Sequence, residues 1–187
     1  MNRVHNVVCA SGWWSRRVEN ELIPFGLKGV DLGDDVLEIG PGLGATTRVL
    51  AERLHHFSVL ELDPGYCERL RAEFGDSVTV TQGDATRLPY PDGRFSAVLC
   101  FTMLHHIPSV ELQDKAFCEI ARVLRPGGTF AGTDSVGRGW LFKLIHVGDI
   151  LNLIDPTTMP ARLEAAGMTA PEIRAGERSF RWRAAKA

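Results

Sequence analysis

The chain has 187 residues, of which 44% are apolar and 24% charged, and its formal net charge is −2 at pH 7. These values are typical of one globular domain with a sizeable core. They give the chain no general electrostatic attraction to nucleic acid or anionic membranes. No apolar run reaches the roughly 18 residues that a membrane span needs. We therefore expect one domain over residues 1–187.

The four cysteines are scattered and contain no C-x-x-C pair. This favours reduced thiols in the cytoplasm over a disulfide framework or a zinc site. The N-terminus lacks the clean apolar core of a signal peptide, which also favours a cytoplasmic location. No grouping of His, Cys, Asp and Glu has metal-ligand spacing, and no nucleophile pattern of the Ser-His-Asp kind stands out. We therefore expect no metal and assign no catalytic residue from spacing.

Residues 1–35 carry the first candidate element. Trp13 and Trp14 are followed by apolar side chains that predict a short helix broken at Pro24. Two interpretations stay open. The helix packs on one side of a sheet, or it is a lid that places a tryptophan against a ligand.

The stretch from Val36 to Leu50 is the centre of the chain. A short apolar strand that carries Glu38 leads into a loop with glycine at positions 40, 42 and 44, and a helix begins near Thr46. Glycine lets the backbone adopt positive φ and approach a ligand closely. In an open parallel sheet such a turn lies at the carboxyl ends of the strands, where ligands bind. The stretch therefore predicts a ligand cradle.

The same glycines also fit the dinucleotide fingerprint G-x-G-x-x-A, with an acid about 20 residues further on at Glu61. Charge separates the two kinds of ligand. An acid at Glu38 would repel a pyrophosphate, whereas it would attract a ligand with an amino group and a sulfonium. S-adenosylmethionine (SAM) is such a ligand and carries no phosphate.

The second and third strands end in polar residues. The second strand, from Val59, carries Glu61 near its end, where one carboxylate can accept hydrogen bonds from both hydroxyls of a ribose. Asp63 precedes Pro64 and is expected to cap the next helix. The third strand, over residues 78–81, is followed by Asp84, which either forms a turn or binds the amino group of an adenine. The backbone N–H of Ala85 would then face a ring nitrogen.

Strands and helices continue to alternate. We expect a buried fourth strand over residues 95–100, an amphipathic helix over 112–124, and a fifth strand over 129–134. This order favours a parallel, doubly wound α/β sheet. Apolar residues at helical spacing over 136–155 predict one more packed helix or an insertion over the site. A short helix over 158–167 and a hairpin over 169–175 and 180–185 follow.

Four stretches in this order resemble the class I SAM-dependent methyltransferases, in the branch that acts on small molecules. They are VLEIGPGLG, ELD at 61–63, GDAT at 83–86, and FSAVLCFTMLHHIP with EIARVLRPGGTF. The resemblance covers residues 34–187. It implies a doubly wound, Rossmann-like α/β fold with a seven-stranded, mostly parallel sheet and a terminal antiparallel hairpin. Residues 136–160 are a candidate substrate-side insertion.

The resemblance assigns roles by position. The residues expected to line the methionine half of SAM are Gly40, Pro41, Gly42 and Gly44. Glu38 would help to hold its amino group, partly through water, and Phe101 would contact its backbone end. Glu61 would bind the ribose. The residues expected against the adenine are Leu62, Asp84 and Ala85.

The resemblance also implies transfer of a methyl group to a small-molecule acceptor, and three other functions stay open. They are a non-catalytic SAM-binding partner, a nicotinamide-dependent oxidoreductase, and an RNA methyltransferase. Against the last, residues 100–103 read CFTM rather than the N/D-P-P-Y of base methylation. The basic residues Arg174, Arg178, Arg181, Arg183 and Lys186 are either an RNA face or charges that protect edge strands. His105 or His106 could act as a base, unless one packs against the next helix and the other is a cap or solvated.

Overall fold

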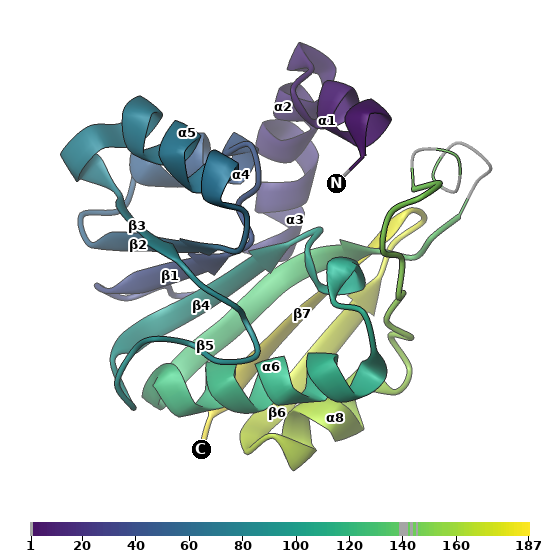
Figure 1. The fold of residues 1–187 in the computed structure, drawn as a ribbon. Coiled ribbons are helices and arrows are strands. Elements are labelled where there is room, and N and C mark those ends of the chain that lie inside the picture. The colour runs from purple at the N-terminus through teal and green to yellow at the C-terminus, as the bar shows by residue number, and fades with distance from the viewer. Residues whose placement is uncertain (1, 139–141, 143, 145) are drawn as a thin grey trace.

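The computed structural model describes residues 2–138, 142, 144 and 146–187. Its strands form one seven-stranded sheet in the order β3-β2-β1-β4-β5-β7-β6 (Figure 1). The strands are β1 (Val36–Ile39), β2 (Phe57–Glu61), β3 (Thr79–Gln82), β4 (Phe95–Phe101), β5 (Leu124–Ser135), β6 (Met168–Ala175) and β7 (Ser179–Lys186). The first five are parallel, and β7 pairs antiparallel with both β5 and β6. The α/β fold predicted from the sequence, with its terminal hairpin, is confirmed.

The central strands are buried on both faces, which explains why they are apolar throughout. Every residue of β1, β2 and β4 is buried. Successive side chains of a strand point to opposite faces, so each strand contributes to two separate cores. Val36 belongs to one core and Leu37 to the other.

Helices cover both faces of the sheet (Figure 1). One core holds residues of α4 (Ala45–Ala51) and α5 (Pro64–Phe74), and the other holds residues of α6 (Val110–Val123) and α8 (Met159–Ala165). Two 3-10 turns, η2 (Gly75–Ser77) and η3 (Leu104–His106), complete the connections. Among the described residues, no helix has the length and apolar character of a membrane span.

Local caps set where two of these helices begin. The Asp63 carboxylate accepts hydrogen bonds from the N–H groups of Gly65 and Tyr66 at 2.8 and 3.1 Å, so this residue caps α5 as predicted. Ser109 caps α6 by accepting the N–H of Leu112. Such caps satisfy donors that a helix leaves free in its first turn.

The N-terminal segment is not broken at Pro24. It forms α1 (Arg3–Cys9), then α2 (Gly12–Arg17), a π-helical turn η1 (Val18–Leu22) and α3 (Ile23–Gly26), and the last three are continuous. The wider π turn lies just before the proline, where it relieves the clash and the lost hydrogen bond of a helical proline. Val18, Leu22 and Ile23 are buried in the core beneath α2 and α3.

Three other expectations differ from the structure. Residues 150–155 are irregular rather than helical, and the predicted helical positions 141 and 145 lie outside the described residues. Strand β5 begins at Leu124, not Thr129, because Leu124 pairs with Phe95 and the register shifts before Thr129 pairs with Ala97. Finally, β7 lies between β5 and β6 and is no edge strand.

Three of the five basic residues named in the hairpin have local partners. Arg174, Arg181 and Arg183 make ion pairs with Glu172. Arg181 also donates hydrogen bonds to backbone carbonyls of the N-terminal segment. These contacts fasten that segment to the sheet.

Candidate active site

The glycine turn after β1 takes the conformation that its sequence requires. Gly40, Gly42 and Gly44 have φ values of 68°, 55° and 76°. At Gly40 a Cβ atom would lie 2.2 Å from Cγ of Met103, so the turn also needs glycine for space. The chain thereby brings the end of β1 against the segment that follows β4.

Glu61 joins the second strand to this turn. Its side chain is only 7% exposed. One carboxylate oxygen accepts the N–H of Gly42 at 2.9 Å, and the other accepts the N–H groups of Leu62 and Asp63 at 2.8 and 3.0 Å. The side chain is therefore a buried acid that lies at the cradle rather than a solvated one.

Glu38 lies behind the turn and is 1% exposed. Its two carboxylate oxygens accept hydrogen bonds from the hydroxyls of Thr46 and Thr47 at the start of α4, the second at 2.7 Å. Burial raises the pKa of the Glu38 carboxyl to about 7, and the two hydroxyls oppose that rise. At neutral pH the group is therefore only partly charged, which weakens the repulsion of a pyrophosphate that its sequence position suggested.

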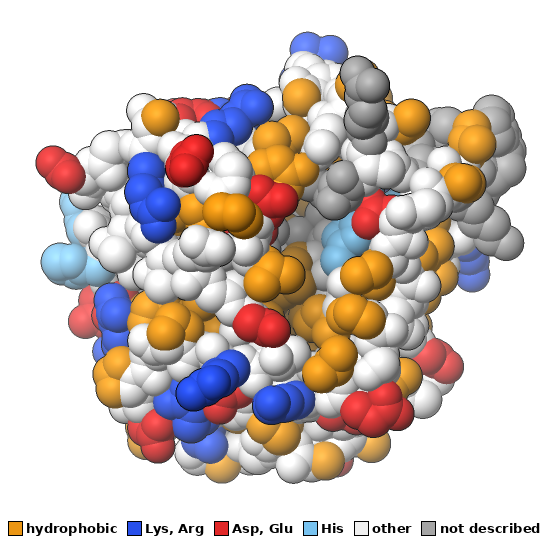
Figure 2. Space-filling model, in the orientation of Figure 1, with side chains coloured by type: hydrophobic (Ala, Val, Ile, Leu, Met, Phe, Trp, Pro, Cys, Tyr) orange, Lys and Arg blue, Asp and Glu red, His pale blue; other side chains and the backbone are white. Residues whose placement is uncertain are grey.

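A cavity of about 1030 Å³ opens at the carboxyl ends of the strands. It corresponds to the hollow in Figure 2, where apolar side chains and pale blue histidine atoms border the opening. The predicted site residues that line it are Gly40, Pro41, Gly42, Glu61, Leu62, Asp84, Ala85 and Phe101. Glu38 and Gly44 do not line it. Most of the site residues predicted from the sequence therefore line a single cavity.

The rim and the far wall come from segments outside the glycine motif. Residues of α1, α2 and η1 line the cavity, among them Trp13 and Trp14. Leu62 is 66% exposed at its edge. Asp84 forms a local turn, in which its carboxylate accepts the N–H of Thr86 at 2.8 Å. Thr102 follows β4 with a φ of 51°, an uncommon value outside glycine.

Polar groups cluster on the far wall, and sequence reasoning found only part of this cluster. His105 is 3% exposed; its Nδ1 lies against the buried carboxylate of Asp134, and its backbone N–H donates to the same carboxylate at 3.1 Å. Its Nε2 lies 3.3 Å from Nε2 of His146. His106 is partly buried, and its ring faces those of His5, His105 and His146.

His105 is thus held by Asp134, and His106 faces a group of imidazole rings rather than open solvent. Burial lowers the pKa of His106 to about 3, so this imidazole is neutral at pH 7 and a weak base. His5 and His146 could not be found from the sequence, because nothing in their spacing links them to positions 105 and 106.

Residues 37–132 match the family model of a methyltransferase domain, which covers half of the chain. The chain belongs to this methyltransferase family. The resemblance to class I SAM-dependent methyltransferases that the motifs indicated is thereby confirmed.

Curated methyltransferases are similar to part of the chain. A demethylmenaquinone methyltransferase of Tropheryma whipplei is 34% identical over 104 residues, which are 54% of this chain and 41% of that protein. A fatty-acid O-methyltransferase of Mycolicibacterium smegmatis is 38% identical over 108 residues, 55% of this chain and 38% of that one. A ribosomal RNA small subunit methyltransferase A of Cupriavidus pinatubonensis is 52% identical, but over only 66 residues, 35% of this chain and 23% of that one. The chain thus spans less than half the length of these relatives.

Among solved structures, a Pyrococcus horikoshii protein has a TM-score of 0.75 at 19% identity, covering 95% of this chain and 93% of that one. At such identity the likeness concerns the fold. The methyltransferase domain of this protein therefore has a fold shared by solved structures over nearly its whole length.

Proposed function

We propose that this protein binds SAM in the cavity at the carboxyl ends of β1, β2 and β3 and transfers its methyl group to a small-molecule acceptor. One observation carries the proposal. The buried carboxylate of Glu61 bonds to Gly42, so the second-strand acid and the glycine turn form one wall of a cavity. Membership of the methyltransferase family supports the same cofactor.

In this proposal Glu61 holds the ribose of SAM. A carboxylate offers about four acceptor sites, and three are already taken by backbone N–H groups. The free site is on the oxygen that faces Gly42. A ribose that uses both of its hydroxyls must therefore share the carboxylate with the Gly42 N–H or displace it.

The adenine would lie against Leu62, whose exposed side chain at the cavity edge would be covered by the ring. Asp84 and Ala85 would bracket the edge of the adenine. The methionine half would follow the glycine turn to Phe101. Glu38 would act indirectly, since its carboxylate holds the turn to Thr46 and Thr47 of α4.

The acceptor is proposed to be a small molecule with a largely apolar body. Ligand pockets are commonly about 300–1,000 Å³, so this cavity has room for SAM and an acceptor together. Apolar side chains on the acceptor side include Trp13, Met103, Ile107, Leu112 and Phe142. The fatty-acid and demethylmenaquinone methyltransferases among the relatives agree with such an acceptor.

Methyl transfer from a sulfonium needs alignment more than a special catalyst, and positioning alone can supply several kcal/mol. A base is required only for an acceptor that must lose a proton. His106 is too weak a base for that step at neutral pH. His105, oriented by Asp134, is the better candidate of the two.

We further propose that residues 1–187 act as a single domain, that α1 and α2 form a lid, and that 136–160 is a substrate-side insertion. Asn2 supports the lid, because it donates hydrogen bonds to Asp149 and to the carbonyl of Val147 across the cavity mouth. A cytoplasmic location is part of the same proposal and is supported by four free cysteines.

RNA methylation is the second candidate, favoured by the short, close match to a ribosomal RNA methyltransferase. Two features count against it. Residues 100–103 lack the tetrapeptide of base methylation, and three hairpin arginines are engaged by Glu172.

A thermal-shift panel with SAM, S-adenosylhomocysteine and NAD tests the cofactor. The proposal predicts a rise in melting temperature with the first two ligands and none with NAD; stabilisation by NAD alone would refute it. Transfer of tritium from methyl-labelled SAM into a lipid extract, a polar metabolite pool or RNA then tests the acceptor. SAM binding without a labelled product in any pool would identify a non-catalytic SAM-binding protein.

A further inference from the structure

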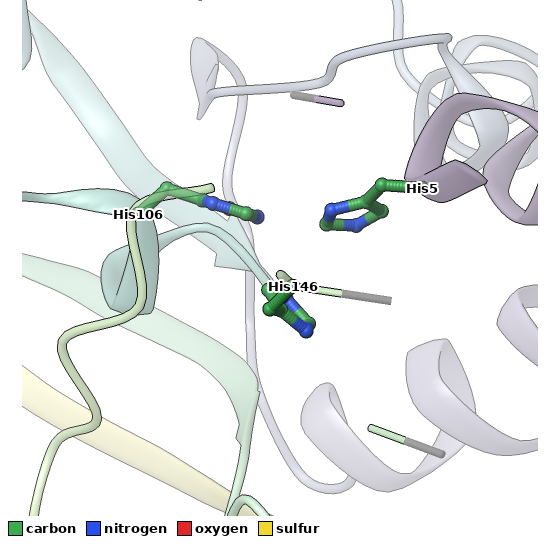
Figure 3. A group of neighbouring side chains, drawn as sticks. All are labelled: His5, His106 and His146. Atoms are coloured by element: carbon green, nitrogen blue, oxygen red, sulfur yellow. The ribbon is translucent and has the colours of Figure 1, made fainter. Parts of the chain in front are cut away.

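Three imidazole side chains meet on the far wall of the cavity. His5 belongs to α1, His106 to η3, and His146 to the segment after β5. One ring nitrogen of each lies within 4.8 Å of those of the other two. Figure 3 shows the rings turned toward a common space. This grouping arises only in the folded chain.

The spacing is close to that of a metal site. Zinc binds imidazole nitrogen at about 2.0–2.1 Å, and tetrahedral geometry then sets ligand nitrogens about 3.3 Å apart. Small rotations of the rings would bring nitrogens 4.8 Å apart to this distance. Imidazole is a preferred ligand of zinc, copper, iron and nickel.

Hydrogen bonds at the other ring nitrogens leave the required lone pairs. Nδ1 of His5 lies 3.1 Å from a carboxylate oxygen of Asp149, which can only accept, so Nδ1 carries the hydrogen and Nε2 the lone pair. A carboxylate that orients an imidazole in this way is the usual partner of a metal-bound histidine. Nδ1 of His146 donates to the carbonyl of Phe142 at 2.7 Å, which leaves Nε2 as its ligand atom.

The contact between the Nε2 atoms of His105 and His146 is a second reason to expect a cation here. Nδ1 of His105 faces the Asp134 carboxylate, so the remaining lone pair of a neutral His105 is on Nε2. That atom lies 3.3 Å from Nε2 of His146, whose lone pair is also free. Two lone pairs repel at this distance unless a proton or a metal ion lies between or beside them.

We propose that His5, His106 and His146 form a binding site for a divalent transition metal ion, with zinc as the best fit. Three histidine ligands leave a fourth position open, as in catalytic rather than structural zinc sites. All three residues line the cavity, so this position faces the proposed acceptor space. Only that last step rests on the proposed function; metal binding itself does not.

The site has a structural consequence. His5 is on α1, whereas His106 belongs to η3 and His146 to the segment after β5. A bound ion would therefore fasten the N-terminal helix to these segments, in addition to the contacts that Asn2 makes with Val147 and Asp149. We expect Zn²⁺ to slow hydrogen exchange of the amides of α1.

The test measures metal binding on full-length, untagged protein without SAM. After zinc loading and dialysis, elemental analysis should find one equivalent of zinc per chain, and Co²⁺ should give the visible absorption of a tetrahedral site. His5→Gln and His106→Gln should each weaken zinc binding at least about 100-fold, since loss of an orienting partner alone costs 10–100-fold. His55→Gln with His56→Gln, at two exposed histidines away from the cavity, is the matched control and should change nothing.

Zinc below one tenth of an equivalent in the wild-type protein, or equal zinc in wild-type and His106→Gln protein, would overturn the proposal. Asp149→Asn provides a milder test if a histidine variant fails to fold. It keeps all three ligands and should weaken zinc binding about 10–100-fold through the orientation of His5. SAM titration of metal-free wild-type and His106→Gln protein separates the two proposals, because SAM should bind to both proteins even if neither binds zinc.

Discussion

Replacement of Glu38 by glutamine should remove a pH-dependent loss of stability that is built into the glycine turn. Burial raises the pKa of this carboxyl from its ordinary value of 4.5 to about 7. Between these values the native state holds a proton that the unfolded chain has released. The native state is therefore favoured at low pH, and the free energy of unfolding falls as the pH rises from about 4.5 to 7.

At 1.36 kcal/mol for each pH unit of difference, the full effect is roughly 3 kcal/mol, of which about 2–3 kcal/mol falls between pH 5 and pH 8. Glutamine has the same shape and no charge at either pH, and its amide can bond to the rotatable hydroxyls of Thr46 and Thr47. The Glu38→Gln variant should therefore gain about 2–3 kcal/mol over wild type between pH 5 and pH 8.

Urea unfolding of both proteins at the two pH values measures this difference, because other titrating groups cancel in the comparison. Glu52→Gln, which removes one exposed carboxyl at the end of α4, is the control and should show no such change. If the stability difference between Glu38→Gln and wild type is the same at pH 5 and pH 8, Glu38 is not the buried, neutral acid described above.

Three further substitutions test the site and the sheet. Glu61→Ala should weaken SAM binding by about 1–3 kcal/mol, the usual cost of losing a charged hydrogen-bond partner; unchanged calorimetric affinity would remove this residue from the site. Gly40→Ala should cost at least about 1–2 kcal/mol from its positive φ alone, plus a clash with Met103 that Met103→Ala should relieve in the double variant. Equal stability of the single and double variants would mean that Met103 does not crowd the turn. Thr133→Val should raise the free energy of unfolding by about 1 kcal/mol, because the buried hydroxyl has no hydrogen-bond partner in the described part of the chain; a destabilised variant would indicate that this hydroxyl has one.

The centre of the sheet could be predicted because β1, β2 and β4 are buried throughout and their sequences are therefore largely apolar. The glycine turn and the capping Asp63 could also be predicted, since each depends on residues next to it in the chain. The predicted helix break at Pro24 was wrong. A proline usually interrupts a helix, but here a π turn just before it keeps the helix continuous. Val18 and Leu22 of this turn are buried in the core, and nothing in the neighbouring sequence indicates a π turn at this point.

The far wall was beyond sequence reasoning for a different reason. His5, His106 and His146 meet only because α1 and the segment after β5 fold over the ends of the same strands, and no period links their positions. Glu38 illustrates the intermediate case. Its place beside the glycine turn could be read from the sequence. Its hydrogen bonds to Thr46 and Thr47 could not, and they direct its carboxylate toward the start of α4 rather than into the cavity.

A structure of the protein with S-adenosylhomocysteine would show directly whether the cavity at the ends of β1, β2 and β3 holds the cofactor. We expect the ribose hydroxyls on the carboxylate of Glu61, the adenine against Leu62 and Asp84, and the sulfur near the glycine turn. A ligand bound elsewhere, or a ribose with no contact to Glu61, would contradict it.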